Sequence, residues 1–433
     1  MKTKRKHHTS IFIWLFLLLF CAVAIPAQQE NDNYNESKVP TYSLPDPLVL
    51  TDGKPVTDAQ TWWQRRRPEI LSLFEQYIYG KTPDKKLEEM SFEISSININ
   101  ALDGKAIRKE ITVYFTEEKN DSKMEILLYV PANNNKPAPV FLGLNYIGNQ
   151  CVLDDSGIAL TKRWVHDRKS YGVINHKVTE ASRGTHVQQW QVERIIDRGY
   201  AFATIYYGDL DPDFDDGFKN GVQPLFYKEE QTRPGPNEWG GIGAWAWGLS
   251  RAMDYLETDK DVESKRVALF GHSRLGKAAL WAAAQDQRFA LVVSNNSGCG
   301  GAALSRRQFG ETVRTINNSF PHWFCGNFKN YNNRENELPV DQHQLITLIA
   351  PRPVYIASAE EDLWADPRGE FLSAKHASPV YRLLGTEGIA RDEMPGVEEP
   401  VKSIIGYHVR PGAHDVTVYD WQQYLDFADR YMK

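Results

Sequence analysis

Seven residues in the second half of the chain, 271–277 with the sequence GHSRLGK, limit its fold more than any other segment. An apolar run over residues 267–270 precedes them, and a run rich in alanine over residues 278–284 follows them. This order predicts a strand, a sharp turn and a helix, with a serine at the turn. The two glycines suit so tight a turn, because a side chain at either position would meet neighbouring backbone.

The serine of this turn, Ser273, belongs either to an ordinary glycine and serine turn or to a nucleophile site. The strand before it and the helix after it favour a nucleophile elbow, which lifts the hydroxyl out of the sheet. The helix start then brings partial positive charge to the hydroxyl, and this charge favours an oxyanion. A nucleophilic serine also needs a histidine base and an acid that orients the base.

Short apolar runs that alternate with helical runs indicate the architecture around this turn. The expected strands cover residues 139–145, 200–206, 267–270, 289–293, 353–357 and 404–408, and the expected helices cover residues 186–198, 241–257, 275–285 and 419–432. This alternation predicts an α/β fold, a mostly parallel sheet with helices on both faces in three layers. Residues 91–117 and 123–131 alternate apolar and polar residues, as antiparallel strands do.

Two long segments between the expected elements, residues 146–185 and 297–350, are too long for plain connections. Loops longer than about 15 residues inside a compact domain usually have a function. We therefore expect inserted loops that shape a site on the sheet.

The N-terminal residues are expected to lie outside this fold. A basic head over residues 2–6, an apolar run over residues 11–25 and small residues after it indicate a cleavable signal peptide over residues 1–27. An apolar run of about 15 residues is short for a membrane span, so we expect a secreted or periplasmic protein without a stable span. A polar linker over residues 28–45 and one catalytic domain over residues 46–433 complete the expected organisation.

Charge and cysteine content narrow the classes of partner and site. A formal net charge of −6, without a basic stripe, argues against a nucleic acid partner. Beyond the signal peptide the cysteines are Cys151, Cys299 and Cys325, which allow at most one disulfide and leave one free thiol. The sequence lacks the paired cysteines or histidines of a metal site, so we expect no metal. It leaves the oligomeric state open, with a monomer favoured.

His414 is the best candidate for the base. In folds with this elbow the chain order is serine, acid and histidine, and the histidine follows the last strand. His414 comes after the expected strand 404–408 and before the expected helix 419–432. The alternatives are His376, which precedes that strand, His408, which lies within it, and a plain surface role for His414.

Asp362 is the leading candidate for the acid, because it follows the expected strand 353–357 closely. Glu360 and Glu361 directly before it are acids that could serve instead. Three consecutive acids also suit a merely solvated loop, so the sequence leaves this choice open.

Two cations near the serine also suit a site. Arg274 follows the serine directly, where its side chain could reach a developing oxyanion. Lys277 lies one helical turn beyond Ser273 on the same face, where it could hold hydroxyls or a carboxylate-derived group of a substrate. The plain alternative for both is a solvated helix start.

Residues 271–277 resemble the elbow of the glucuronoyl esterases, carbohydrate esterase family 15, whose pattern is Gly-[Cys/His]-Ser-Arg-x-Gly-Lys. The resemblance extends along most of the chain, from about residue 60 to residue 430. The other matching segments are residues 198–201, 207–209, 297–307, 338–343, 349–353 and 362–367.

The resemblance implies an α/β-hydrolase fold, no cofactor, and cleavage of esters between glucuronic or 4-O-methylglucuronic acid on xylan and alcohols of lignin. The implied substrate is therefore glucuronoxylan or a lignin–carbohydrate ester. The implied roles are Ser273 as nucleophile, His414 as base and Arg274 as oxyanion donor, with Lys277, Glu311 and Trp364 binding the glucuronoyl ring.

One position departs from the pattern of the fungal members, many of which carry the catalytic acid as Glu just before a Ser-Gly-x-Gly-Gly segment. Asn296 holds that place here and cannot act as an anion. Some bacterial members resemble this chain in carrying an Asp after the next strand, which agrees with Asp362.

Two other functions compete with the glucuronoyl esterase hypothesis. One is an acetyl-xylan or feruloyl esterase, against which Lys277 and Glu311 argue. The other is a secreted glycan-binding protein that kept the fold and lost catalysis, which we expect to lack a member of the serine, histidine and acid set.

Overall fold

The computed structural model describes residues 32–84, 87–119, 122–132 and 136–433, so the expected signal peptide and the first linker residues lie outside the described chain. A ten-stranded sheet runs through the molecule in the order β1-β2-β3-β7-β4-β8-β9-β10-β12-β11. Its strands are β1 (Ser91–Ala101), β2 (Ala106–Tyr114), β3 (Lys123–Pro131), β4 (Ala138–Asn145), β7 (Ala201–Tyr206), β8 (Val262–His272), β9 (Leu291–Asn295), β10 (Val354–Ala359), β11 (Val401–Lys402) and β12 (Ile405–Arg410). A separate small sheet pairs β5 (Val173–Ile174) with β6 (Lys177–Val178).

The centre of the large sheet is parallel, from β7 through β4, β8, β9 and β10 to β12. Antiparallel strands flank it, with β1, β2 and β3 at one edge and β11 at the other. Every residue of β4, β7, β9, β10 and β12 is buried, which is why these strands are largely apolar in the sequence. The expected mostly parallel sheet is confirmed.

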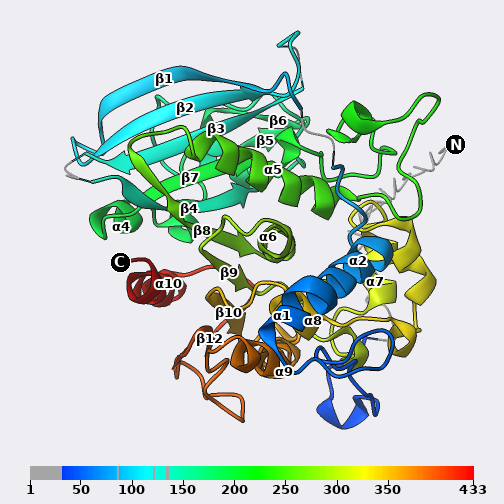
Figure 1. The fold of residues 1–433 in the computed structure, drawn as a ribbon. Helices are drawn as coiled ribbons and strands as arrows, with labels where there is room; N and C mark the ends of the chain where they lie inside the picture. Colours follow the sequence, from blue (N-terminus) through cyan, green and yellow to red (C-terminus); the bar gives the residue numbers. More distant parts are fainter. Residues whose placement is uncertain (1–31, 85–86, 120–121, 133–135) are drawn as a thin grey trace, which may run out of the picture.

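Helices cover both faces of the sheet and complete the three layers (Figure 1). The α-helices are α1 (Ala59–Thr61), α2 (Arg67–Tyr77), α3 (Val187–Trp190), α4 (Val192–Asp197), α5 (Gly241–Leu256), α6 (Arg274–Gln285), α7 (Val313–Ser319), α8 (Gln342–Thr347), α9 (Pro367–Leu383) and α10 (Val418–Met432). A π-helical turn over Trp62–Arg66 leads into α2. Helices α4 and α10 lie on one face, while α5, α6 and α9 lie on the other.

Among the differences from the expected helices, two have a clear local cause. The single helix expected over residues 186–198 is wrong, because Gln191 has a left-handed φ of 46° and separates α3 from α4. The second difference is α9, a helix of 17 residues where the sequence analysis expected none. Asp366 caps its start and Pro367 occupies its first turn.

Residues 32–45, the described part of the expected polar linker, contact the body of the protein. The backbone N–H of Gly310 donates to the carbonyl of Asn33 at 2.8 Å. Glu36 forms an ion pair with Arg307 at 2.5 Å. This segment therefore packs on the second of the two long loops.

The three cysteines of the described chain, Cys151, Cys299 and Cys325, are buried and free. Burial raises the pKa of each thiol, so the thiols stay protonated at neutral pH and are poor nucleophiles. Across the described ranges, each helix is too short or too polar to traverse a lipid bilayer.

Candidate active site

The turn at Ser273 joins the end of β8 to the start of α6 under backbone strain. Its φ of 57° and ψ of −130° lie outside the regions that serine ordinarily adopts. A Cβ atom at Gly271 would overlap the backbone of Leu275, and one at Gly276 would lie 3.0 Å from the Ser297 side chain. The expected clash with backbone is confirmed at Gly271, whereas at Gly276 the space for a side chain is tight without an overlap.

His414 and Asp362 lie together at the carboxyl end of the parallel sheet. The His414 Nδ1 is 2.6 Å from the Asp362 Oδ2, and the side-chain amide of Asn296 donates to the same oxygen at 2.6 Å. Burial alone would raise the pKa of Asp362, but its bonds with His414 and Asn296 outweigh burial and hold the pKa below its usual range. The carboxylate is therefore an anion at neutral pH, and it binds the imidazole.

The ring of His414 lies beside the serine turn, over the residue that precedes the serine. The rings of His272 and His414 have centroids 4.5 Å apart. His272 is fixed in turn, because its Nδ1 is 2.6 Å from the Asn295 Oδ1. Burial first, and the neighbouring His414 second, lower the pKa of His272 to about 3, so this histidine stays neutral and does not repel a protonated His414.

The neighbouring acids have a different position. Glu360 and Glu361 are exposed, whereas Asp362 is buried. The backbone N–H of Glu360 donates to the Arg410 carbonyl at 2.8 Å, and that of Glu361 donates to the Gly412 carbonyl at 3.1 Å. These backbone bonds hold residues 360–362 against residues 410–414 and leave Asp362 facing the imidazole of His414.

The two alternative histidines, His376 and His408, contact other residues away from the serine turn. His408 is completely buried in β12, with its Nε2 2.9 Å from the Asp420 carboxylate. His376 is exposed on α9, where its ring lies edge-on to that of His343. Neither ring lies over the serine turn.

Arg274 is anchored rather than free. Its Nη1 forms an ion pair with the Asp213 Oδ2, and its Cζ lies 4.8 Å from the ring centroid of Trp323 and 5.7 Å from that of Tyr146. The Tyr146 hydroxyl donates to the carbonyl of His272, directly before the serine. Sequence reasoning missed Asp213 and Tyr146, since no local pattern links them to the elbow.

Lys277 lies on the buried side of α6. Its ammonium donates to the Ser297 carbonyl at 2.8 Å and to the Cys299 carbonyl at 2.5 Å, and it lies 3.3 Å from the Glu311 Oε2. Its three protons therefore have acceptors on the second long loop. The plain alternative of a solvated helix start is wrong for Lys277.

Glu311 is buried beside that ammonium, and Trp364 is partly exposed next to it. Burial raises the pKa of Glu311, although Lys277 opposes the shift. The Glu311 N–H donates to the Trp364 carbonyl at 2.9 Å, and the Trp364 residue is 39% exposed. The structure thus brings an acid, a cation and an exposed indole into one region.

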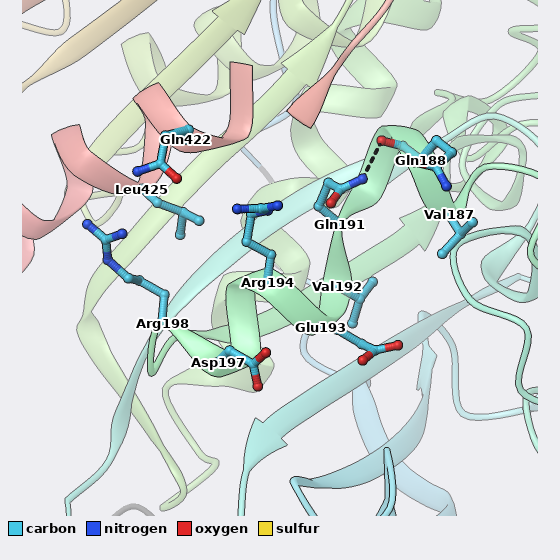
Figure 2. A pocket seen from close by; sticks show the side chains of 10 residues that line it. All are labelled: Val187, Gln188, Gln191, Val192, Glu193, Arg194, Asp197, Arg198, Gln422 and Leu425. Atoms are coloured by element: carbon cyan, nitrogen blue, oxygen red, sulfur yellow. Dashed lines mark hydrogen bonds between the residues drawn. The ribbon is translucent and has the colours of Figure 1, made fainter. Parts of the chain in front are cut away.

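A surface hollow of about 550 Å³ lies away from these residues, between α4 and α10 (Figure 2). Its lining comes from residues 187–198 and from Gln422 and Leu425, and it includes none of the expected site residues.

Comparisons with known proteins agree with this geometry. A family model described as glucuronyl esterase, fungi, matches residues 226–385. A carbohydrate esterase from an unknown prokaryotic organism is 54% identical over 406 residues, which cover 94% of this chain and 93% of the relative.

Two solved structures are similar over nearly the whole chain. A promiscuous CE15 esterase from the marine bacterial metagenome has a TM-score of 0.88 at 54% identity, over 93% of this chain and 100% of that one. A glucuronoyl esterase from Solibacter usitatus has a TM-score of 0.87 at 52% identity, over 92% of this chain and 100% of that one. The resemblance read from the sequence is confirmed, and this chain belongs to the glucuronoyl esterases of carbohydrate esterase family 15, carboxylic ester hydrolases with an α/β-hydrolase fold.

Proposed function

We propose that this protein hydrolyses esters of glucuronic and 4-O-methylglucuronic acid, as found between glucuronoxylan and lignin, with Ser273, His414 and Asp362 as its catalytic residues. The observation that carries the proposal is the 2.6 Å bond between His414 and Asp362 beside the strained serine turn. The family of the chain supports the substrate class.

The proposed reaction begins with proton transfer from the Ser273 hydroxyl to the Nε2 of His414. The Asp362 carboxylate holds the opposite nitrogen, Nδ1, and so fixes the tautomer whose Nε2 accepts a proton. The serine oxygen attacks the uronate carbonyl and forms a tetrahedral oxyanion. The alcohol then leaves with the proton from His414, and water releases the uronate from the serine by the same steps.

The oxyanion needs donors, and Arg274 and the backbone N–H groups at the start of α6 are the candidates. Such donors typically contribute about 3 kcal/mol each to the stability of the transition state. The N-terminal end of α6 adds its partial positive charge on the same side.

Lys277, Glu311 and Trp364 are the proposed contacts of the glucuronoyl ring. The bond of Lys277 to Glu311 is the longest of its three, at 3.3 Å, and is the one that a sugar hydroxyl would most readily replace. A partly exposed indole beside a carboxylate suits a sugar, whose face is apolar and whose edge carries hydroxyls.

Benzyl glucuronate tests this function. The purified protein is expected to release benzyl alcohol and glucuronate with a higher kcat/KM than for 4-nitrophenyl acetate or methyl ferulate, because the uronate ring adds binding contacts. Product formation is followed by chromatography. Hydrolysis of the acetate or ferulate without any hydrolysis of the uronate ester would refute the substrate class.

A variant at Glu311 separates ring binding from the chemical step within this assay. Glu311→Gln keeps the shape of the side chain and removes its charge, which is expected to lower kcat/KM for the uronate about ten- to hundredfold. Hydrolysis of 4-nitrophenyl acetate should stay unchanged, because the acetate lacks the ring. Equal losses on both substrates would mean that Glu311 supports the fold rather than the ring.

Export follows from the same proposal, because a polysaccharide ester lies outside the cytoplasm. We place a cleavable signal over residues 1–27, ahead of a short linker and a catalytic domain over residues 46–433. Protein expressed with its own N-terminus is expected in the periplasm or medium, with sequencing of the mature chain starting near residue 28. Recovery of the intact chain from the cytoplasm would contradict this assignment.

A further inference from the structure

The carboxylate of Asp213 lies in the segment between β7 and α5, and its side chain is 2% exposed. Both of its oxygens are occupied. Oδ1 lies 2.9 Å from the His322 Nε2 and accepts from the Trp323 indole at 2.7 Å. Oδ2 accepts from the Tyr207 hydroxyl at 3.0 Å and from the Arg274 guanidinium. A carboxylate with this many donors has one fixed position.

The Arg274 guanidinium is held between this carboxylate and a set of aromatic rings. Its Cζ lies 4.8 Å from the Trp323 centroid and 5.5 Å from the Phe320 centroid, and these two rings stack in parallel at 3.7 Å. Its hydrogen bond to Asp213 uses Nη1 and its Nε is buried, while the side chain as a whole is 26% exposed. The side chain is thus anchored at one nitrogen and keeps donor capacity beside the serine turn.

An anchor of this kind matters for an oxyanion donor. A free arginine samples many rotamers, and the anionic transition state would have to order it before gaining its hydrogen bond. A donor that is already fixed needs no reorganisation at the moment of reaction, so the transition state loses no free energy in ordering it. The Asp213 carboxylate also keeps the guanidinium inside the protein, where a cation without a counter-ion is unfavourable.

We propose that Asp213 is a positioning residue for the esterase reaction, holding Arg274 so that its remaining donors face the oxyanion formed at Ser273. The inference rests on the proposed function, in which Arg274 stabilises that oxyanion. A purely structural role, a brace between the segment after β7 and the segment that carries His322 and Trp323, is the alternative.

A double-mutant cycle with Asp213→Asn and Arg274→Ala distinguishes the two roles. In Asp213→Asn an amide N–H can face the guanidinium, so we expect kcat on benzyl glucuronate to fall about ten- to hundredfold with KM little changed. Arg274→Ala should lower kcat about 10²- to 10³-fold. In the Arg274→Ala background, Asp213→Asn should cost no more than about twofold, because the donor that it positions is gone.

Asp259 provides a matched control. It is also buried, at 3% side-chain exposure, and it pairs with Lys109 at 2.7 Å, ahead of β8 at the end opposite Ser273. Asp259→Asn should lower the melting temperature, as is also expected for Asp213→Asn, and leave kcat unchanged. Loss of kcat in both variants would overturn a specific role for Asp213.

A milder variant covers the case in which Asp213→Asn does not fold. Trp323→Phe removes one donor to Asp213 and keeps a ring over Arg274, so a smaller loss of kcat is expected, again absent in the Arg274→Ala background.

The inference fails if wild-type protein hydrolyses the uronate ester and Asp213→Asn either leaves kcat unchanged or lowers it equally with and without Arg274. It also fails if Arg274→Ala leaves kcat unchanged. Failure of the proposed function has a different signature, since wild-type protein would then not hydrolyse the uronate ester.

Discussion

Replacement of Ser273 by alanine is expected to lower kcat for uronate esters about 10⁶-fold, to the level left by binding and the oxyanion donors alone. The serine oxygen forms the acyl-enzyme, and an alanine side chain has no oxygen to take its place. The measurement is the initial rate of benzyl alcohol release at saturating substrate, with enzyme at high concentration. Retention of more than about one per cent of kcat would remove Ser273 as the nucleophile.

The backbone strain at Ser273 provides a control for folding. Its φ of 57° costs about 1–3 kcal/mol for a residue with a side chain, and glycine avoids most of that cost. Ser273→Ala should therefore melt near the wild-type temperature, whereas Ser273→Gly should melt about 2 °C higher. Both should be inactive. Lower melting temperatures for both variants would show that the hydroxyl stabilises the fold and would confound the activity loss.

Much of the sheet was predictable from the sequence, because strands buried on both faces are mostly apolar. The last strand shows this, since the expected residues 404–408 correspond to β12 (Ile405–Arg410) with all its residues buried. Helix α9 was harder to predict. Its apolar pattern contains Lys375, His376 and Pro379, and the proline inside a helix is usually a sign against one.

Local signals could have found the start of α9 and could not have found the break near residue 191. Asp366 before Pro367 is a capping residue followed by a proline in the first turn, a recognised helix start. Gln191 carries no such signal, because glutamine seldom adopts a left-handed conformation. Tertiary packing fixes that residue, so the chain alone predicted one helix instead of two.

The candidate site was also predictable only in part. Ser273 and His414 follow from fold order, because the topology puts each at a fixed point after a strand. The choice among Glu360, Glu361 and Asp362 depended on backbone bonds to another loop, which sequence cannot show. Asp213 lies 61 positions before Arg274, and only the packing of the segment between β7 and α5 against the serine turn brings them together.

Replacement of Asp362 is expected to have the second large effect on kcat. Asp362→Ala is expected to lower kcat about 10⁴-fold, since the imidazole then loses the partner that selects its tautomer and stabilises its protonated form. Asn296→Ala should cost little, because it removes a neutral donor to the carboxylate and leaves the carboxylate in place. Steady-state kcat on benzyl glucuronate measures both. The reverse order of effects would overturn the assignment of the acid.

A stability measurement across pH gives an independent check on Asp362. Its folded pKa lies below the unfolded value of about 3.9, so its bonds stabilise the folded state fully above that pH. This contribution disappears as the pH falls toward the folded pKa. The difference in unfolding free energy between wild type and Asp362→Asn should therefore be largest near pH 7 and shrink below pH 4. A difference that does not change with pH would mean that the carboxylate has no ionic role in the fold.

A rescue variant tests whether geometry at this site decides which residue serves as the acid. The Asn296 amide and the His414 ring both contact the Oδ2 of Asp362, each at 2.6 Å. A longer side chain at position 296 could therefore reach the imidazole. In the Asp362→Ala background, Asn296→Glu is expected to restore kcat at least tenfold, because a carboxylate would again reach the Nδ1. Asn296→Gln in the same background carries no charge and should restore nothing. Equal recovery in both variants would mean that filling the space left by Asp362, and not the charge, supports the histidine.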